Sequence, residues 1–294
     1  MFKLSQNKQE AFLFSADQRA KASIRLQEGG RLQELWLQDE LIICEPKGMS
    51  YQQSFAAAIL FPFANRIAQG KYSFKGQDYQ LPTNESGRHN AIHGLIYDKT
   101  FEIIEHQEKN EFVSFSIVYE EQHPPAGFPF PFKIILTYCL FADKLELKIE
   151  IKNTGHKDLP FTLGWHPYFY SSDLSSAKLT FHPQHQVLFD TNMITKGKVS
   201  AEIEKPFMIA DKNLDDCFTL QKQQVEFESD NRIIGISSTP FHPYLQVYTP
   251  PTRDAIAIEP MTGISDTFNN DIGLQVLPVD KSYEQSWKIT KLLR

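Results

Sequence analysis

Alternation of apolar and polar residues with a period of two runs through most of this chain, and it constrains the fold more than any other feature. Successive side chains of a β-strand point to opposite faces, so such alternation is typical of strands with one buried face. The apolar positions include 23 Phe and 11 Tyr, which are strong β formers. No window of helical length keeps a 3.6-residue period. We therefore expect an all-β fold.

Turn residues between the alternating segments predict hairpins. Lys75-Gly76 separates residues 71–74 from residues 77–81, which is a short connection that contains a glycine. The same pattern pairs 101–107 with 112–119, 133–141 with 145–152 and 225–228 with 232–237, and it makes 284–292 a closing strand.

No linker rich in Gly, Ser or Pro and no block of like charges divides the chain. We therefore expect residues 1–294 to form one domain, a large antiparallel β-sandwich. The segments 82–90 and 191–211 are expected to be long loops that lie over one face of it, where binding groups usually gather.

The charge and the cysteines exclude several classes of protein. A net charge of -6, with acidic and basic residues interspersed, offers no positive face for nucleic acid or for a membrane surface. No stretch approaches the length of a membrane-spanning segment. Cys44, Cys139 and Cys217 leave one thiol unpaired in any disulfide scheme and lack metal-finger spacing. We therefore expect a cytoplasmic protein.

Glu259 follows the apolar run 255–258, which would be a buried central strand. Desolvation raises the proton affinity of a carboxylate in such surroundings towards that of a useful general base. The simpler interpretation is a glutamate at the end of a strand in an ion pair, for instance with Arg253.

His166 has the aromatic neighbours Trp165, Tyr168 and Phe169. Their flat apolar surfaces suit sugar rings, and an imidazolium in this position could donate a proton near neutral pH. A structural histidine is the alternative, since most histidines have no catalytic role. Together with Glu259, His166 would supply the acid and the base of general acid–base catalysis.

Three further positions carry polar groups in suggestive surroundings. His93 stands before Gly94, where a strand meets a tight turn, although a ring bonded to a loop carbonyl is the simpler interpretation. Arg66 emerges from an apolar stretch, which favours a directed role, although an exposed arginine is the default interpretation. Asp215 and Asp216 could bind hydroxyl groups or form an ordinary acidic turn. Their spacing suits no metal geometry, so neither a metal nor a cofactor is expected.

In their order along the chain, several short segments resemble the aldose 1-epimerase (galactose mutarotase-like) family, over about residues 23–292. The resemblance implies the family's fold, a supersandwich of β-strands with few short helices and a sugar cleft across one sheet. It also implies the family's activity, the interconversion of the α and β anomers of an aldohexose by a cofactor-independent isomerase. The segments that carry it are 65–70, 90–94, 166–169, 214–218, 246–249, 258–260 and 266–269.

The resemblance also implies roles for single residues. Glu259 matches the general base, His166 the general acid, and His93 the second histidine near the ring oxygen. The positions that hold sugar hydroxyl groups in the family are here Asn65, Arg66, Asp215 and Gln246.

The match at these positions is close, but the surroundings depart from the family pattern. Asp215 matches better than Asp216, because the family's aspartate stands three residues before the phenylalanine, here Phe218. Leu95 occupies a position where galactose-specific members often have a second glycine, and Tyr170-Ser171 stands where they often have Asn-Leu. These departures imply different pocket walls, so the aldose is left open.

The chemistry requires that the C1 hydroxyl loses a proton while the ring oxygen gains one. We expect Glu259 and His166 to face each other across a gap wide enough for one pyranose. We also expect a bell-shaped pH profile in which Glu259 sets the acidic limb and His166 the alkaline limb. The expected partner is a monosaccharide, and the protein is expected to be a monomer or a homodimer.

Three other functions compete with this one. A hexose-6-phosphate 1-epimerase on the same fold would need cations that converge on the phosphate, for which Arg88 and Lys99 are candidates. A non-catalytic carbohydrate-binding protein would keep aromatic platforms such as Trp165 but would not need Glu259 with His166. A glycoside hydrolase usually needs two carboxylates on either side of the bond, and one good candidate is present.

Overall fold

Two large antiparallel sheets contain most of the strands of this computed structural model, which describes residues 1–85, 87–222 and 224–293. The predicted all-β fold is confirmed, with only short helices among the described residues. None of these helices has the length and hydrophobicity needed to span a membrane.

The larger sheet has thirteen strands among the described residues, and its middle strands carry most of the polar site described below. In spatial order it contains β1 (Lys3–Gln6), β2 (Glu10–Phe14), β3 (Lys21–Arg25), β4 (Arg31–Leu37), β5 (Glu40–Ile43), β17 (Tyr168–Tyr170), β26 (Ala255–Met261), β25 (Tyr244–Tyr248), β22 (Asp215–Leu220), β19 (Pro183–Phe189) and β20 (Thr195–Ser200); β16 (Gly164–Trp165) pairs with β26, and β6 (Ile59–Leu60) pairs with β16.

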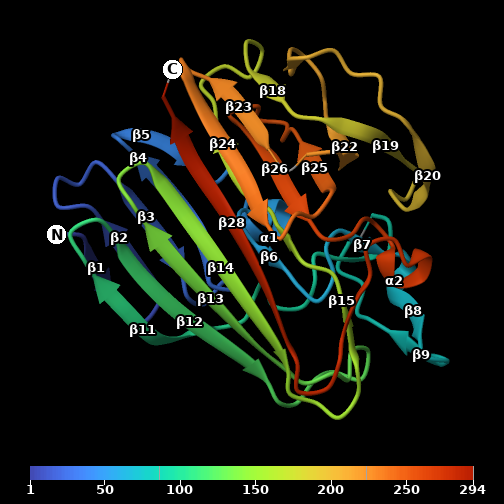
Figure 1. Cartoon of the computed structure of the whole chain (residues 1–294). Coiled ribbons are helices and arrows are strands. Elements are labelled where there is room, and N and C mark those ends of the chain that lie inside the picture. The colour runs from blue at the N-terminus through green and yellow to red at the C-terminus, as the bar shows by residue number, and fades with distance from the viewer. Residues whose placement is uncertain (86, 223, 294) are drawn as a thin grey trace.

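The second sheet has nine strands within the same ranges, and it includes three of the predicted hairpins. Figure 1 shows its long strands running side by side, with β28 between β14 and β24. In spatial order the strands are β11 (Glu102–Glu108), β12 (Val113–Glu121), β13 (Phe132–Leu140), β14 (Lys144–Asn153), β28 (Ser282–Leu292), β24 (Arg232–Thr239), β23 (Val225–Ser229), β18 (Lys178–Thr180) and β21 (Phe207–Met208).

Short elements complete the fold. The hairpin predicted around Lys75-Gly76 is confirmed as β8 (Lys71–Phe74) paired with β9 (Gln77–Gln80). The others are the pair β7 (Arg66–Ile67) and β10 (Ala91–Ile92), the pair β15 (Leu159–Phe161) and β27 (Gln275–Leu277), the helices α1 (Tyr51–Ser54) and α2 (Thr267–Asn270), and a 3₁₀ turn at Ala68–Gly70.

The prediction of one long loop at 191–211 is wrong, because β20 and β21 lie within it. Most side chains of β20 are exposed, so no buried face marked the strand in the sequence. The segment 82–90 contains no strand among its described residues and is closed by a bridge between Glu85 and Asn90; Ser86 lies outside the described residues.

The core lies between the two large sheets. The indole rings of Trp165 on β16 and Trp287 on β28 stack with their centroids 6.0 Å apart, and both side chains are buried. Alternate residues of β13, such as Leu136, pack in the same apolar cluster as Leu35 of β4 and Phe169 of β17. Polar side chains that alternate with these core residues on the middle strands of the larger sheet therefore point away from the core.

Candidate active site

The register of β25 and β26 places polar groups on one face of the larger sheet. Ile256 and Ile258 belong to the core, so Ala257 and Glu259 face the opposite side. Gln246 of β25 lies directly opposite Glu259 and shares that face. The apolar run that precedes Glu259 thus carries the carboxyl group into a buried position, where its side chain is 2% exposed.

The neighbouring strands add three groups to this face. Tyr168 of β17 and Tyr248 of β25 lie opposite Ala257 from its two sides, and Asp215 of β22 lies opposite Tyr248. Asp216 faces the other way and accepts a hydrogen bond from Gln186 at 2.8 Å. The geometry therefore brings Asp215, and not Asp216, to Glu259.

His166 connects β16 to β17 and contacts Glu259. Its backbone N–H donates to Ala58 O at 3.1 Å, and its carbonyl accepts from Ala57 N–H at 2.8 Å. These bonds fix the connection, and they leave His166 Nε2 3.3 Å from Glu259 Oε1. The alternative partner for Glu259 is excluded, because Arg253 donates instead to the carbonyls of Lys212 and Ala210.

The expected aromatic platform around His166 is only partly present. The Tyr168 ring lies 5.1 Å from the His166 ring, centroid to centroid, and both line the site. Trp165 and Phe169 belong to the core cluster on the other side of the sheet. The expectation that they surround the imidazole was wrong, because alternation along the strand separates them from it.

A tight turn brings His93 beside His166. His93 N–H donates to Asn65 O at 2.9 Å, with φ +64° at His93 and +80° at Gly94. A Cβ at position 94 would lie 2.2 Å from Phe61 O, so only glycine fits there. The rings of His93 and His166 meet edge to face, with centroids 5.1 Å apart.

Side chains on the site floor form a continuous hydrogen-bonded chain. Arg66 Nη1 donates to Asn65 Oδ1 at 3.2 Å, and Asn65 Nδ2 donates to Gln246 Oε1 at 3.3 Å. Gln246 Nε2 then donates to Asp215 Oδ1 at 2.7 Å. The cation at one end and the carboxylate at the other set the orientation of both amides. All seven site residues expected from the sequence thus lie at one place.

These groups line a hollow of about 480 Å³ that opens to solvent. Its size lies within the range of small-molecule sites. The hollow is lined by Gln52, Gln53, Ser54, Phe55, Asn65, Arg66, Asn84, Glu85, Gly87, Arg88, Ile92, His93, His166, Tyr168, Asp215, Gln246, Tyr248 and Glu259.

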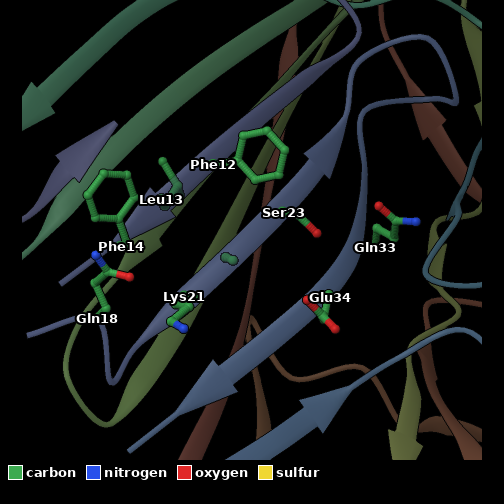
Figure 2. Close-up of a pocket in the computed structure, with 9 residues that line it drawn as sticks. Phe12, Leu13, Phe14, Gln18, Lys21, Ser23, Gln33 and Glu34 are labelled. Carbon is green, nitrogen blue, oxygen red and sulfur yellow. The ribbon is translucent and has the colours of Figure 1, made fainter. Parts of the chain in front are cut away.

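A second hollow, of about 340 Å³, lies over β2, β3 and β4 (Figure 2). Phe12, Lys21 and Glu34 are among the residues that line it. Its lining contains one carboxylate and no histidine, so it lacks the paired acid and base of the first hollow.

Burial opposes charge on both members of the Glu259–His166 pair. It raises the pKa of Glu259 well above 4.5, and the charge of Asp215 adds to this effect while that of Arg66 opposes it. Burial lowers the pKa of His166 from 6.5 to about 4. Burial therefore favours the uncharged form of both groups, and the His166 imidazole is neutral near pH 7. The expected standing imidazolium is wrong for the free protein.

Several buried polar atoms of the site have no hydrogen-bond partner among the described residues. They are His93 Nδ1, His166 Nδ1 and Glu259 Oε2. Buried polar groups are almost always hydrogen-bonded, so three unpaired atoms on neighbouring residues set this place apart from the rest of the described chain. No three His, Cys, Asp or Glu side chains in the described part of the chain are grouped so that they could hold a metal ion.

The expected gap for a pyranose between Glu259 and His166 is absent. At 3.3 Å the two groups are neighbours on one wall, so a sugar can lie against the pair but not between its members.

Some residues of the hollow carried no signal in the sequence. Glu85 lies in the polar segment 82–90, and Tyr248 lies in an ordinary strand, so neither differed from its surroundings.

Comparison with known proteins decides the family. The sequence model of the family described as aldose 1-epimerase matches residues 11–290. The chain belongs to the aldose 1-epimerase family. The strand arrangement agrees, since a galactose mutarotase-like protein from Clostridium acetobutylicum superposes with a TM-score of 0.88, covering 100% of this chain and 99% of that one. At 18% identity this likeness shows the fold alone.

The chain is also similar in sequence to two curated proteins. It is 27% identical to the uncharacterized protein YihR of Escherichia coli K12 over 274 residues, which are 89% of this chain and 87% of YihR. It is also 27% identical to galactose mutarotase from Rattus norvegicus over 175 residues, 55% of this chain. That match spans about half (49%) of the mutarotase, so the sugar and the reaction are matters for proposal.

Proposed function

We propose that this protein is an aldose 1-epimerase that interconverts the α and β anomers of a neutral aldohexose. The observation that carries the proposal is the 3.3 Å contact between His166 Nε2 and Glu259 Oε1 at the wall of the hollow. The two sugar oxygens that exchange protons in anomerisation, O1 and O5, are both bonded to C1 and therefore lie side by side. An acid and a base that are immediate neighbours match that arrangement.

Glu259 as carboxylate takes the proton of the C1 hydroxyl while His166 as imidazolium gives a proton to O5. The C1–O5 bond then breaks, and the open-chain aldehyde forms. This step leaves Glu259 protonated and His166 neutral, which is the form that burial favours. Rotation about C1–C2 presents the other face of the carbonyl, and the reverse transfers close the ring with inverted configuration.

The remaining groups hold the sugar and balance charge. Arg66 and His93 are suited to stabilise the negative charge that develops on O5. Burial, with the charges of His166 and Arg66, lowers the pKa of His93 well below 6.5, so its ring acts as a neutral donor. Asn65, Asp215 and Gln246 present fixed donors and acceptors for hydroxyl groups, which keep the sugar in place while C1 turns.

A hexose-6-phosphate 1-epimerase has less support. Arg88 lines the hollow but donates to Glu85 at 3.0 Å, and Arg66 is paired with the same carboxylate. Lys99 lines a different hollow and lies 3.4 Å from Asp98. The two cations suggested for a phosphate therefore do not converge. A carbohydrate-binding platform on Trp165 is excluded by the burial of that ring.

Polarimetry on freshly dissolved α-D-glucose and α-D-galactose tests the proposal. The wild type is expected to speed equilibration of at least one sugar. Glu259→Gln keeps the shape of the side chain but cannot accept the proton, so the rate should fall by about 10²–10⁴-fold.

Glu102→Gln is the matched control, because Glu102 is exposed on β11 in the other sheet. It should equilibrate the sugars at the wild-type rate. A wild type that leaves every aldose at its spontaneous rate, or a Glu259→Gln variant as fast as wild type, would refute the proposed function.

A further inference from the structure

Glu85 lies on the segment between β9 and β10 and contacts one edge of the Arg66 guanidinium. Arg66 Nε lies 3.0 Å from Glu85 Oε1 and 3.1 Å from Oε2, and Arg66 Nη2 lies 3.0 Å from Oε1. Both side chains are largely buried, with 10% of Arg66 and 13% of Glu85 exposed. Such a bidentate contact fixes the plane of the guanidinium as well as its position.

The contacts of Arg66 can be counted against its hydrogen atoms. A guanidinium has five N–H groups. Glu85 accepts from Nε and lies 3.0 Å from Nη2, and Asn65 accepts from Nη1. Among the described residues, no other side chain accepts from Nη1 or Nη2, and Arg66 lines the hollow.

Glu85 is itself held from other sides. Asn90 Nδ2 donates to Glu85 Oε2 at 2.9 Å, and Arg88 Nη1 donates to Glu85 Oε1 at 3.0 Å. Asn90 is anchored in turn, since it accepts from Gln69 N–H at 3.2 Å and donates to Asn192 O at 3.0 Å. The carboxylate therefore has a fixed place from which to hold Arg66.

We propose that Glu85 is the positioning residue of Arg66: it aims the terminal N–H groups of the guanidinium at the sugar and offsets its charge beside Glu259. The proposal rests on the proposed function, since Arg66 is assigned there to the sugar. It explains why a carboxylate that donates or accepts no proton in the proposed reaction lines the hollow. It also explains how a third carboxylate can lie in the same hollow as Asp215 and Glu259 without repelling the substrate oxygens.

The electrostatics agree with this geometry. Burial alone would raise the pKa of Glu85, but the hydrogen bonds and charge of Arg66, with bonds from Asn90 and Arg88, outweigh it and lower the pKa. Glu85 is thus a carboxylate at neutral pH. The charge of Arg66 lowers the pKa of Glu259, so removal of Glu85 should strengthen that effect. The other titratable groups that face Glu259 are His166, Asp215, Tyr168, Tyr248 and Cys217.

Two variants separate position from charge. Glu85→Asp keeps the charge but shortens the reach, and Glu85→Gln keeps the length but removes the charge. Both should raise KM about tenfold, which is the usual cost of a lost charge-assisted hydrogen bond. Only Glu85→Gln should also lower the pKa of Glu259. The limb of the pH profile that reports ionisation of Glu259, which is the alkaline limb, should then move to lower pH. Glu102→Gln serves again as the control with unchanged KM and profile.

A purely structural ion pair predicts a different result. Variants that unfold at lower temperature but keep the wild-type KM and pH profile would overturn the proposal, as would equal pH profiles for Glu85→Gln and Glu85→Asp. Calorimetric titration with glucose and galactose repeats the test without turnover, with about tenfold weaker binding expected in both variants. A wild type that binds sugar without interconverting it would refute the proposed function alone, whereas one that also fails to bind would refute both.

Discussion

Glu259 and His166 are buried, and burial favours the uncharged form of each side chain. At pH values between its two pKa values, the pair holds one proton, which either residue can carry. Protonation of His166 adds a second proton at low pH, and ionisation of Glu259 removes the last one at high pH. Catalysis needs the singly protonated pair in either arrangement.

The pH profile should therefore be a bell with its limbs exchanged relative to the expectation from sequence. kcat/KM should rise through about pH 4, the pKa of the buried His166, and fall where Glu259 ionises, well above 4.5. A pH series at low substrate concentration measures both limbs. A profile that stays level from about pH 3 to pH 10 would contradict these roles.

Glu259→Gln should stabilise the protein at high pH. The folded pKa of Glu259 lies above its unfolded value of 4.5, so the unfolded state releases this proton first and wild-type stability falls as pH rises through that interval. Glutamine carries no such penalty. The Tm difference, variant minus wild type, should therefore grow between about pH 5 and pH 8, as thermal unfolding at both values would show. A constant difference would argue against a raised pKa.

At the scale of elements, the turn that follows β10 decides where His93 stands. Gly94 has φ +80°, and its backbone lies against that of Phe61. No residue with a side chain fits at this position without a clash.

Gly94→Ala should destabilise the fold more than Gly76→Ala. Both glycines have positive φ, which costs alanine about 1–2 kcal/mol. Only position 94 adds a collision with Phe61 O, whereas nothing lies within 4 Å of a Cβ at position 76. Denaturant unfolding of both variants would measure the difference in free energy. Equal losses would show that the turn relaxes around the added methyl group.

Strands with one buried face were predictable from the sequence, and strands without one were not. β13 and β14 alternate buried and partly exposed residues along their length, so the hairpin was visible. The side chains of β20 are mostly exposed, so its sequence predicts a loop. The site divides in a similar way: Glu259 stood out because a charge ended an apolar run, but Glu85 is one polar residue among others. Its importance depends on Arg66, 19 residues away, which only the folded chain brings near.

At the scale of the whole molecule, the two sheets are joined directly behind the site. Trp165 precedes His166 and stacks on Trp287, so the imidazole is backed by the core. One cluster of buried residues contains side chains from Phe2 to Ile289, in keeping with the prediction of one domain, which stays a prediction.

Trp287→Ala should remove about 3–5 kcal/mol of stability, because it opens a cavity between the sheets. Trp287→Phe should cost less, since a ring still fills part of the space. Chemical denaturation of the two variants gives both values. A loss of less than about 1 kcal/mol for the alanine variant would mean that the sheets collapse together around the missing indole.

The position of β28 has a consequence for the growing chain. Residues 282–292 pair with β14 on one side and β24 on the other, in the middle of the nine-stranded sheet. While a ribosome is still making residues before 282, the strands β11 to β14 and the strands β18, β21, β23 and β24 have no partner to join them. Each group then shows an open edge to its surroundings, which is the usual route to aggregation. Chaperones would be needed most in that interval, and least once residue 292 has emerged.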